Sequence, residues 1–161
     1  MRGDANIIAL LNTCLKVELT ATDQYLLHGE MYRDWGFKTL GDMVCEESAE
    51  EREHARKLIQ RILFLEGAPN LADRMALRIA ATVPEGLAND LALETDGRKI
   101  LVDGVQQCEA ARDYVSRQLL VELLKDTEEH IDFLETQISL TAALGEQNYL
   151  QSATGELSGG S

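Results

Sequence analysis

Residues 47–54 read ESAEEREH, and within this stretch Glu51 and His54 stand three positions apart. On an α-helix that spacing puts the carboxylate and the imidazole on one face, about one turn apart. Both side chains can then reach the same metal ion. The stretch therefore predicts part of a metal site presented by a single helix.

The residues on either side place this pair on a helix face that is predicted to be buried. The face follows the 4-3 rhythm of a helix-bundle seam, at Leu40, Val44, Glu47, Glu51, His54, Leu58 and Leu65. Burying Glu and His side chains is costly unless they are paired, protonated or bound to a metal ion. A metal centre inside a bundle accounts for their presence on the seam.

Composition favours one helical domain with an acidic surface. The chain has 161 residues, of which 45% are hydrophobic and only 5% aromatic, and it has two prolines. Lys and Arg total 15 against 28 Asp and Glu, which gives a formal net charge of −13. Such a surface repels nucleic acid and anionic membranes and attracts cations. We therefore expect neither a nucleic-acid partner nor a membrane partner.

Cysteine usage and hydropathy bear on the compartment. Cys14, Cys45 and Cys108 are odd in number, far apart in the sequence and without metal or redox spacing, as is typical of a reducing environment. The first residues lead into an amphipathic segment rather than a signal peptide, and no apolar run approaches membrane-spanning length. These features predict a cytoplasmic protein.

The periodicity predicts an all-α fold. Four long helices are expected at about residues 4–34, with Asp4 or Asn6 as the N-cap, then at 38–66, 82–111 and 113–144, and a short fifth helix at 146–153. Residues 67–82 lack periodicity and are long for a loop, so they are expected to cross the length of a four-helix bundle. The predicted domain is residues 1–153, and residues 154–161 are predicted to be a flexible tail.

Each long helix carries a polar residue that interrupts its apolar seam. Ferritin-like bundles with one long crossover build a di-iron centre from a Glu on each of two helices and a Glu-x-x-His on each of the other two. Glu18 on the first helix matches the first kind of ligand, as does Glu94 within the third-helix seam of Leu91, Arg98 and Leu101. The predicted ligands are Glu18, Glu51, His54, Glu94 and His130.

Longer strings resemble the bacterioferritin family over nearly the whole chain, to about residue 153. The matching strings are MRGD at 1–4, DQYLLH at 23–28, ILFLEGAPNL at 62–71, DLALE at 90–94, DYVSR at 113–117, HIDFLET at 130–136 and QNYLQ at 147–151. The resemblance implies a hollow twenty-four-subunit cage that oxidises Fe(II) with O₂ or peroxide and stores a ferric mineral. It also implies haem b at each two-fold interface, held between two methionines, one from each subunit.

The resemblance also assigns roles to single residues. It maps the five predicted ligands onto the ferroxidase centre, and Tyr25 matches the tyrosine beside that centre, which makes Tyr25 a sixth candidate site residue. Glu47, Glu50 and Asp126 lie where the family places acidic residues along the iron route.

Two positions depart from the family pattern. The haem methionine would be residue 52, where this chain has Arg52, and a permanently charged guanidinium cannot replace a thioether ligand. Thr127 stands where a bridging Glu is expected, so the centre loses one negative charge. A subunit that departs at both sites suggests a cage of two subunit types. Haem could then be held only at an interface with a partner subunit that carries the methionine.

Three functional alternatives follow. The first is an iron-storage subunit with impaired or partial ferroxidase activity that assembles with itself and a second bacterioferritin subunit. The second is a fully active di-iron oxidase in which Glu128 or a water molecule repairs the centre; Glu128 would need a local π-bulge, because it lies about 100° around the helix from Thr127. The third is a structural cage subunit that binds no iron.

Overall fold

A computed structural model of the protein describes residues 1–157, so residues 158–161 of the predicted flexible tail lie outside the described residues. The described residues form α-helices and no strand, which confirms the all-α prediction. The helices are α1 (Ala5–Asp34), α2 (Lys38–Phe64), α3 (Val83–Ala110), α4 (Tyr114–Leu144) and α5 (Glu146–Ser152).

Side chains at the helix N-termini explain where three of the long helices begin. The Asp4 carboxylate accepts from the backbone N–H of Asn6 at 2.7 Å, so Asp4 rather than Asn6 is the N-cap of α1. Thr82 caps α3 in the same way, and Asp113 caps α4. Each cap supplies an acceptor for an amide that has no partner within the helix.

The second helix ends at Phe64, two residues before the predicted end. Glu66 takes the left-handed backbone conformation, with φ of 63°, and stops the helix. Gly67 follows at a point where the chain passes close to α1, because a Cβ on it would lie 2.6 Å from Cγ2 of Ile8. This glycine lets the outgoing chain pass close to α1.

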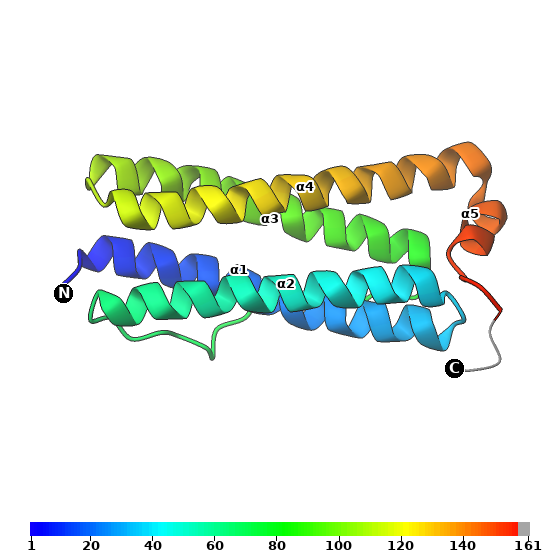
Figure 1. Ribbon diagram of the computed structural model, residues 1–161, viewed down its shortest axis with the longest axis horizontal. Helices are drawn as coiled ribbons and strands as arrows, with labels where there is room; N and C mark the ends of the chain where they lie inside the picture. The colour runs from blue at the N-terminus through cyan, green and yellow to red at the C-terminus, as the bar shows by residue number, and fades with distance from the viewer. Residues whose placement is uncertain (158–161) are drawn as a thin grey trace.

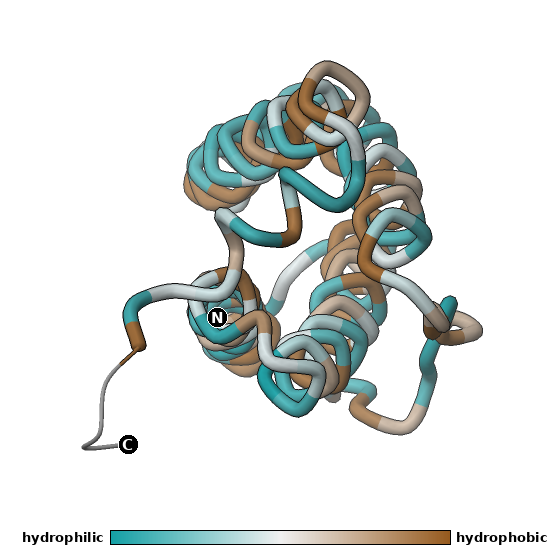
Figure 2. The backbone as a smooth tube through the Cα atoms, turned by 90° about the vertical axis from the view of Figure 1, so that its right-hand side faces the viewer, coloured by the Kyte–Doolittle hydropathy of each residue, from teal (hydrophilic) through white to brown (hydrophobic). Residues whose placement is uncertain are grey.

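The long helices form two antiparallel hairpins that pack together as a bundle (Figure 1). Helices α1 and α2 pack most extensively on each other, α3 packs on α4, and the two hairpins meet mainly through α1 and α3. The crossover at residues 65–82 runs from the far end of α2 to the opposite end of the bundle, and α5 packs on the end of α4. Seen end-on in Figure 2, the four long helices surround a common centre. No helix among the described residues is long and apolar enough to cross a membrane.

Hydrogen bonds from backbone amides of the crossover to side chains of α1 hold the crossover against the bundle. Three α1 side chains spaced four residues apart each accept a crossover amide: Thr20 from Met75 at 2.9 Å, Gln24 from Arg78 at 3.0 Å and His28 from Ala80 at 3.0 Å. Asp90 of α3 accepts from Nδ1 of His28 at 2.8 Å, which leaves Nε2 of His28 free to accept the Ala80 amide. The predicted crossover is therefore an ordered part of the fold.

The apolar core is divided into two clusters. One contains Leu11, Leu15, Leu58, Leu101 and Leu120, and the other contains Tyr25, Val44, Leu87, Leu93 and Leu134. On every long helix the predicted metal ligands fall between the residues of the two clusters. One predicted seam residue is wrong: Arg98 is exposed and pairs with Glu128, because the buried face of α3 turns through Glu94, Gly97 and Leu101.

Candidate metal centre

The predicted ligands meet in the middle of the bundle, one side chain or pair from each long helix. Glu18 comes from α1, Glu51 and His54 from α2, Glu94 from α3 and His130 from α4. Every one of these residues is at most 5% exposed. Five titratable side chains are thus enclosed between two apolar clusters, where uncompensated charge is costly.

One group of possible ligands consists of Glu18, Glu51 and His54. Nδ1 of His54 lies 3.3 Å from Oε2 of Glu51 and 3.6 Å from Oε2 of Glu18. This nitrogen is buried and has no hydrogen-bond partner within the described residues. A buried nitrogen without a partner, facing two carboxylates, fits a cation placed among the three.

A second group consists of Glu47, Glu51 and His130, whose ligand atoms lie within 4.8 Å of one another. Nδ1 of His130 lies 2.9 Å from Oε1 of Glu94 and 3.6 Å from Oε2 of Glu47. Glu51 belongs to both groups, so its carboxylate is placed to bridge two metal positions. The geometry therefore offers two overlapping groups of candidate metal ligands that share Glu51.

Tyr25 completes the centre on the α1 side. Its hydroxyl donates to Oε1 of Glu94 at 2.6 Å, and its ring meets the ring of His130 edge-on with centroids 5.2 Å apart. Burial, together with the charges of Glu94 and Glu51, raises the pKa of Tyr25 well above its usual value. The hydroxyl therefore stays protonated and holds the Glu94 carboxylate in one orientation.

Burial and mutual repulsion govern the charges of this cluster. Burial raises the pKa of Glu51 to about 8, and the neighbouring Glu18 adds to the shift. Burial likewise raises the pKa of Glu47 and that of Glu94 to about 7. Burial alone lowers the pKa of His54 and of His130, but the facing carboxylates outweigh it and raise both. Near neutral pH the metal-free centre therefore retains protons that a metal ion would displace.

Comparison with known proteins agrees with this architecture. The family model described as a ferritin-like domain matches residues 8–144. A bacterioferritin of Brucella melitensis is 48% identical over 94% of both chains, and a bacterial ferritin of Pseudomonas aeruginosa is 46% identical over 94% of this chain and 99% of its own. A bacterioferritin of Mycobacterium leprae is 42% identical over 92% of this chain and 94% of its own. The chain belongs to the bacterioferritin family.

Thr127, where the family resemblance predicts a bridging Glu, lies within the candidate centre. Its side chain is buried, at 3% exposure, on the α4 face that carries His130. A hydroxyl there is neutral and shorter than a glutamate side chain, so this position contributes no charge to balance a metal ion. A carboxylate in place of the one that Glu would supply at position 127 would therefore have to come from another residue.

Glu128 does not supply that carboxylate. Helix α4 is α-helical from Tyr114 to Leu144, without the π-bulge that would turn Glu128 inward. The Glu128 side chain is half exposed and accepts from Nε of Arg98 at 2.8 Å. Repair of the centre by Glu128 therefore finds no support in this geometry.

Arg52, where the family resemblance predicts a haem methionine, lies outside the candidate centre. It is exposed on α2 and borders a groove lined by Leu19, Ala49, Arg52, Glu53, Ala55, Arg56, Ile59 and Leu71. None of these lining residues is a methionine, and the two arginines at the rim have no lone pair for iron. The groove of this chain therefore does not fit bis-methionine ligation of haem.

Two residues have contacts that the sequence did not indicate. Glu47, which the sequence places on the α2 seam and along the iron route but not among the ligands, comes within reach of Glu51 and His130. Asp126, also expected along the route, accepts from Nε2 of His54 at 2.9 Å. That contact joins α2 and α4, and no local sequence pattern indicates it.

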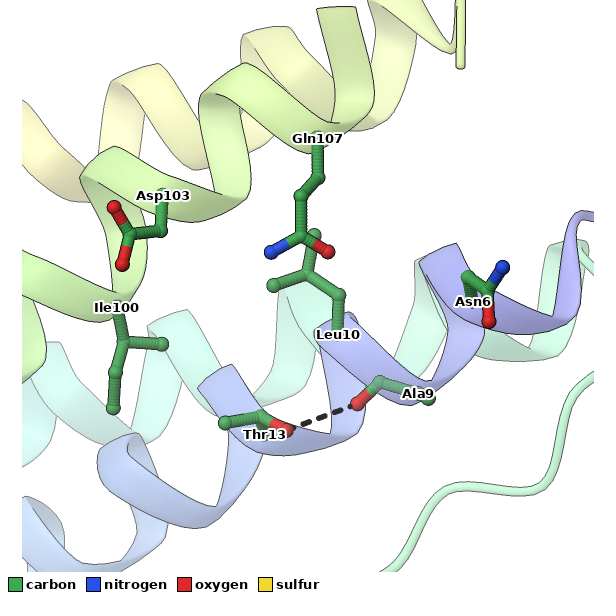
Figure 3. Close-up of a pocket in the computed structure, with 7 residues that line it drawn as sticks. All are labelled: Asn6, Ala9, Leu10, Thr13, Ile100, Asp103 and Gln107. Atoms are coloured by element: carbon green, nitrogen blue, oxygen red, sulfur yellow. Dashed lines mark hydrogen bonds between the residues drawn. The ribbon is translucent and has the colours of Figure 1, made fainter. Parts of the chain in front are cut away.

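A second hollow, between the first half of α1 and the last half of α3, is chemically different (Figure 3). Its lining residues are Asn6, Ala9, Leu10, Thr13, Ile100, Asp103 and Gln107. Asp103 is the single charged group among them, and the Thr13 hydroxyl donates a hydrogen bond to the Ala9 carbonyl. This hollow lacks the set of donors that a metal ion requires.

Proposed function

We propose that this chain stores iron as a subunit of a hollow cage of twenty-four chains and that its buried centre oxidises Fe(II). The observation that carries the proposal is Nδ1 of His54, which is buried, makes no hydrogen bond among residues 1–157 and faces the carboxylates of Glu18 and Glu51. Fe(II) is the substrate: carboxylates and imidazoles bind it, and O₂ or peroxide takes its electron. The net charge of −13 favours the approach of the cation.

The cage is proposed to lie in the cytoplasm and to assemble from copies of this chain. Family membership supports self-assembly, and the acidic surface argues against nucleic acid and anionic membranes as partners. Native mass spectrometry of the purified protein measures the assembly directly. A discrete mass of twenty-four chains is the expected result, and a monomer or dimer as the only species would contradict the cage.

Metal analysis after Fe(II) loading tests the role of the centre. Glu18→Ala removes one buried carboxylate, and we expect it to lower both the bound iron and the initial oxidation rate by at least tenfold. Glu46→Gln, an exposed change on α2, is the control and should leave both unchanged. Equal iron loading in Glu18→Ala and the unaltered protein would favour a purely structural cage subunit.

We propose that oxidation by this centre is slower than in a centre with a glutamate at position 127. A neutral hydroxyl in place of a bridging carboxylate leaves the second ion less well held, so Thr127→Glu should raise the initial rate of Fe(II) oxidation by about tenfold or more. Stopped-flow absorbance of the ferric product measures that rate. An unchanged rate would instead support the alternative of a fully active centre repaired by Glu128 or a water molecule.

The proposal includes a second subunit type, motivated by Arg52 and Thr127 together. A partner with methionine at position 52 would supply a haem ligand that this chain lacks. Native mass spectrometry with a visible spectrum, on untagged protein from its own cells, tests it. Two subunit masses with a Soret band (the intense haem absorption) would support a mixed cage. One mass without a Soret band would mean a homomeric, haem-free cage.

A further inference from the structure

The carboxylate of Glu47 lies beside Glu51 and His130, at the edge of the candidate centre. Glu47 is one turn before Glu51 on α2, and its Oε2 lies 3.6 Å from Nδ1 of His130. Its side chain is 24% exposed, whereas the neighbouring Glu46 and Glu50 face solvent. Glu47 therefore faces the centre from its edge.

The charge of two divalent cations in the centre would be balanced by four carboxylates, of which Glu47 could be one. With Thr127 neutral, Glu18, Glu51 and Glu94 supply three carboxylates to the centre. Two divalent cations carry four positive charges, and a buried site favours neutral overall charge. Glu47 would supply the fourth carboxylate. Like Glu94, it lies close to Nδ1 of His130.

An independent observation favours an ion in the cluster over internal pairing alone. Within the part of the chain that the structure describes, Nδ1 of His54 is buried and makes no hydrogen bond, although it lies 3.3 Å from Oε2 of Glu51, the residue shared by both groups. If the acidic cluster existed only to satisfy its own polar groups, this nitrogen would be expected to have a partner.

We propose that Glu47 is a ligand of the second metal ion in this chain and replaces the carboxylate lost at Thr127. Glu51 bridges the two positions: the first ion lies with Glu18 and His54, and the second with Glu47, Glu94 and His130. The inference rests on the proposed iron function and names the residue that ligates the second ion.

The two positions differ in their exposure to solvent. The first is formed by residues that are each at most 5% exposed, whereas the second includes the partly exposed Glu47. Water screens the attraction between a partly exposed carboxylate and a cation, so such a ligand binds its ion less tightly than a buried one. We therefore expect two binding affinities per subunit, with the second ion held more weakly.

Co²⁺ is a suitable probe because it binds the same oxygen and nitrogen ligands without being oxidised by air in such a site. The assembled metal-free protein is titrated and followed by visible absorption, which is far more intense for low-coordinate Co²⁺ than for hydrated Co²⁺ on the acidic surface. We expect two ions per subunit in the unaltered protein. Glu47→Gln should weaken the second ion at least tenfold and leave the first unchanged.

Two further variants make the test specific. Glu46→Gln removes one carboxylate from the adjacent, exposed position of α2 and should keep both ions. The double variant Glu47→Gln with Thr127→Glu should regain the second ion, because the new carboxylate on α4 replaces the one removed from α2. Native mass and circular dichroism of every variant confirm assembly and helicity.

Several outcomes would overturn the inference. Two ions retained in Glu47→Gln would show that Glu47 is not a ligand, and so would a single ion in the unaltered protein. Both results leave iron binding at Glu18, Glu51 and His54 intact. The absence of any Co²⁺ in the centre of the unaltered protein would overturn the proposed iron function together with this inference.

Discussion

The carboxylate of Asp126 accepts a hydrogen bond from Nε2 of His54 at 2.9 Å, and this contact orients the imidazole toward the metal centre. A carboxylate accepts only, so the proton lies on Nε2 and Nδ1 keeps its lone pair when the ring is neutral. Helix α4 thus determines which nitrogen of an α2 side chain can bind metal.

Asp126→Ala should therefore weaken the first metal position without disturbing the fold. Removing the partner of a ligating histidine costs about tenfold or more in metal affinity. Co²⁺ titration of the assembled protein measures the change. Glu129→Ala, an exposed acid on the same helix, is the matched control. An equal loss in both variants would indicate a general effect of surface charge rather than orientation of His54.

Metal binding should strengthen as the pH rises from about 6 to about 8. The pKa is raised to about 7 for Glu47 and Glu94 and to about 8 for Glu51, mainly by burial, so these groups hold protons at the lower end of that range. Protons and metal ions compete for the same atoms. Raising the pH removes the competitor, and affinity should rise about tenfold per pH unit for each proton displaced.

The same competition can be measured directly. Co²⁺ added to weakly buffered protein at pH 7 should release protons, which a pH indicator reports. Glu51→Gln removes one of the proton-binding groups and should reduce the release. Proton uptake, or an affinity that does not change with pH, would contradict the raised pKa of these carboxyl groups.

Arg52→Met should allow a homomeric cage of this chain to bind haem. The groove beside α2 has apolar walls, including Leu19, Ile59 and Leu71, and no methionine among its lining residues. Titration with haem b should produce a Soret band in Arg52→Met and none in the unaltered protein. Arg56→Met makes the same change one turn along the helix and should not bind haem in this way. Equal spectra for both variants would show that replacing an arginine of the groove with any apolar side chain is enough for haem binding.

His28→Ala should loosen the crossover. The change leaves the Ala80 amide without its acceptor and the Asp90 carboxylate with Gln24 in place of two donors, Gln24 and His28, which costs about 2–4 kcal/mol in the free energy of unfolding. Urea denaturation of the metal-free protein measures the loss, and hydrogen exchange should rise in residues 75–80. Asp96→Asn breaks only an exposed pair with Arg78 and should cost less than about 1 kcal/mol.

Much of the architecture could be predicted from local pattern. Helix lengths, the crossover and the antiparallel hairpins follow from the periodicity, the caps and the loop length, and the structure confirms them. The structure also brings Glu18, Glu51, His54, Glu94 and His130 together, because each interrupts an apolar seam at the same height in the bundle. Arg98 is an exception to this prediction. Its spacing suits a seam, but the buried face of α3 passes through Gly97 and leaves Arg98 exposed and paired with Glu128.

The sequence by itself determined the helices, the seam on which the polar residues lie and the two departures at Arg52 and Thr127, because periodicity and residue type are local properties. Only the tertiary structure decided that Glu128 faces Arg98, that Asp126 holds His54 and that Glu47 comes within reach of His130. These contacts join residues 30 to 83 positions apart, and packing of the helices sets which side chains meet. The chemistry of the centre therefore depends on the relative rotation of four helices, which no single stretch of sequence encodes.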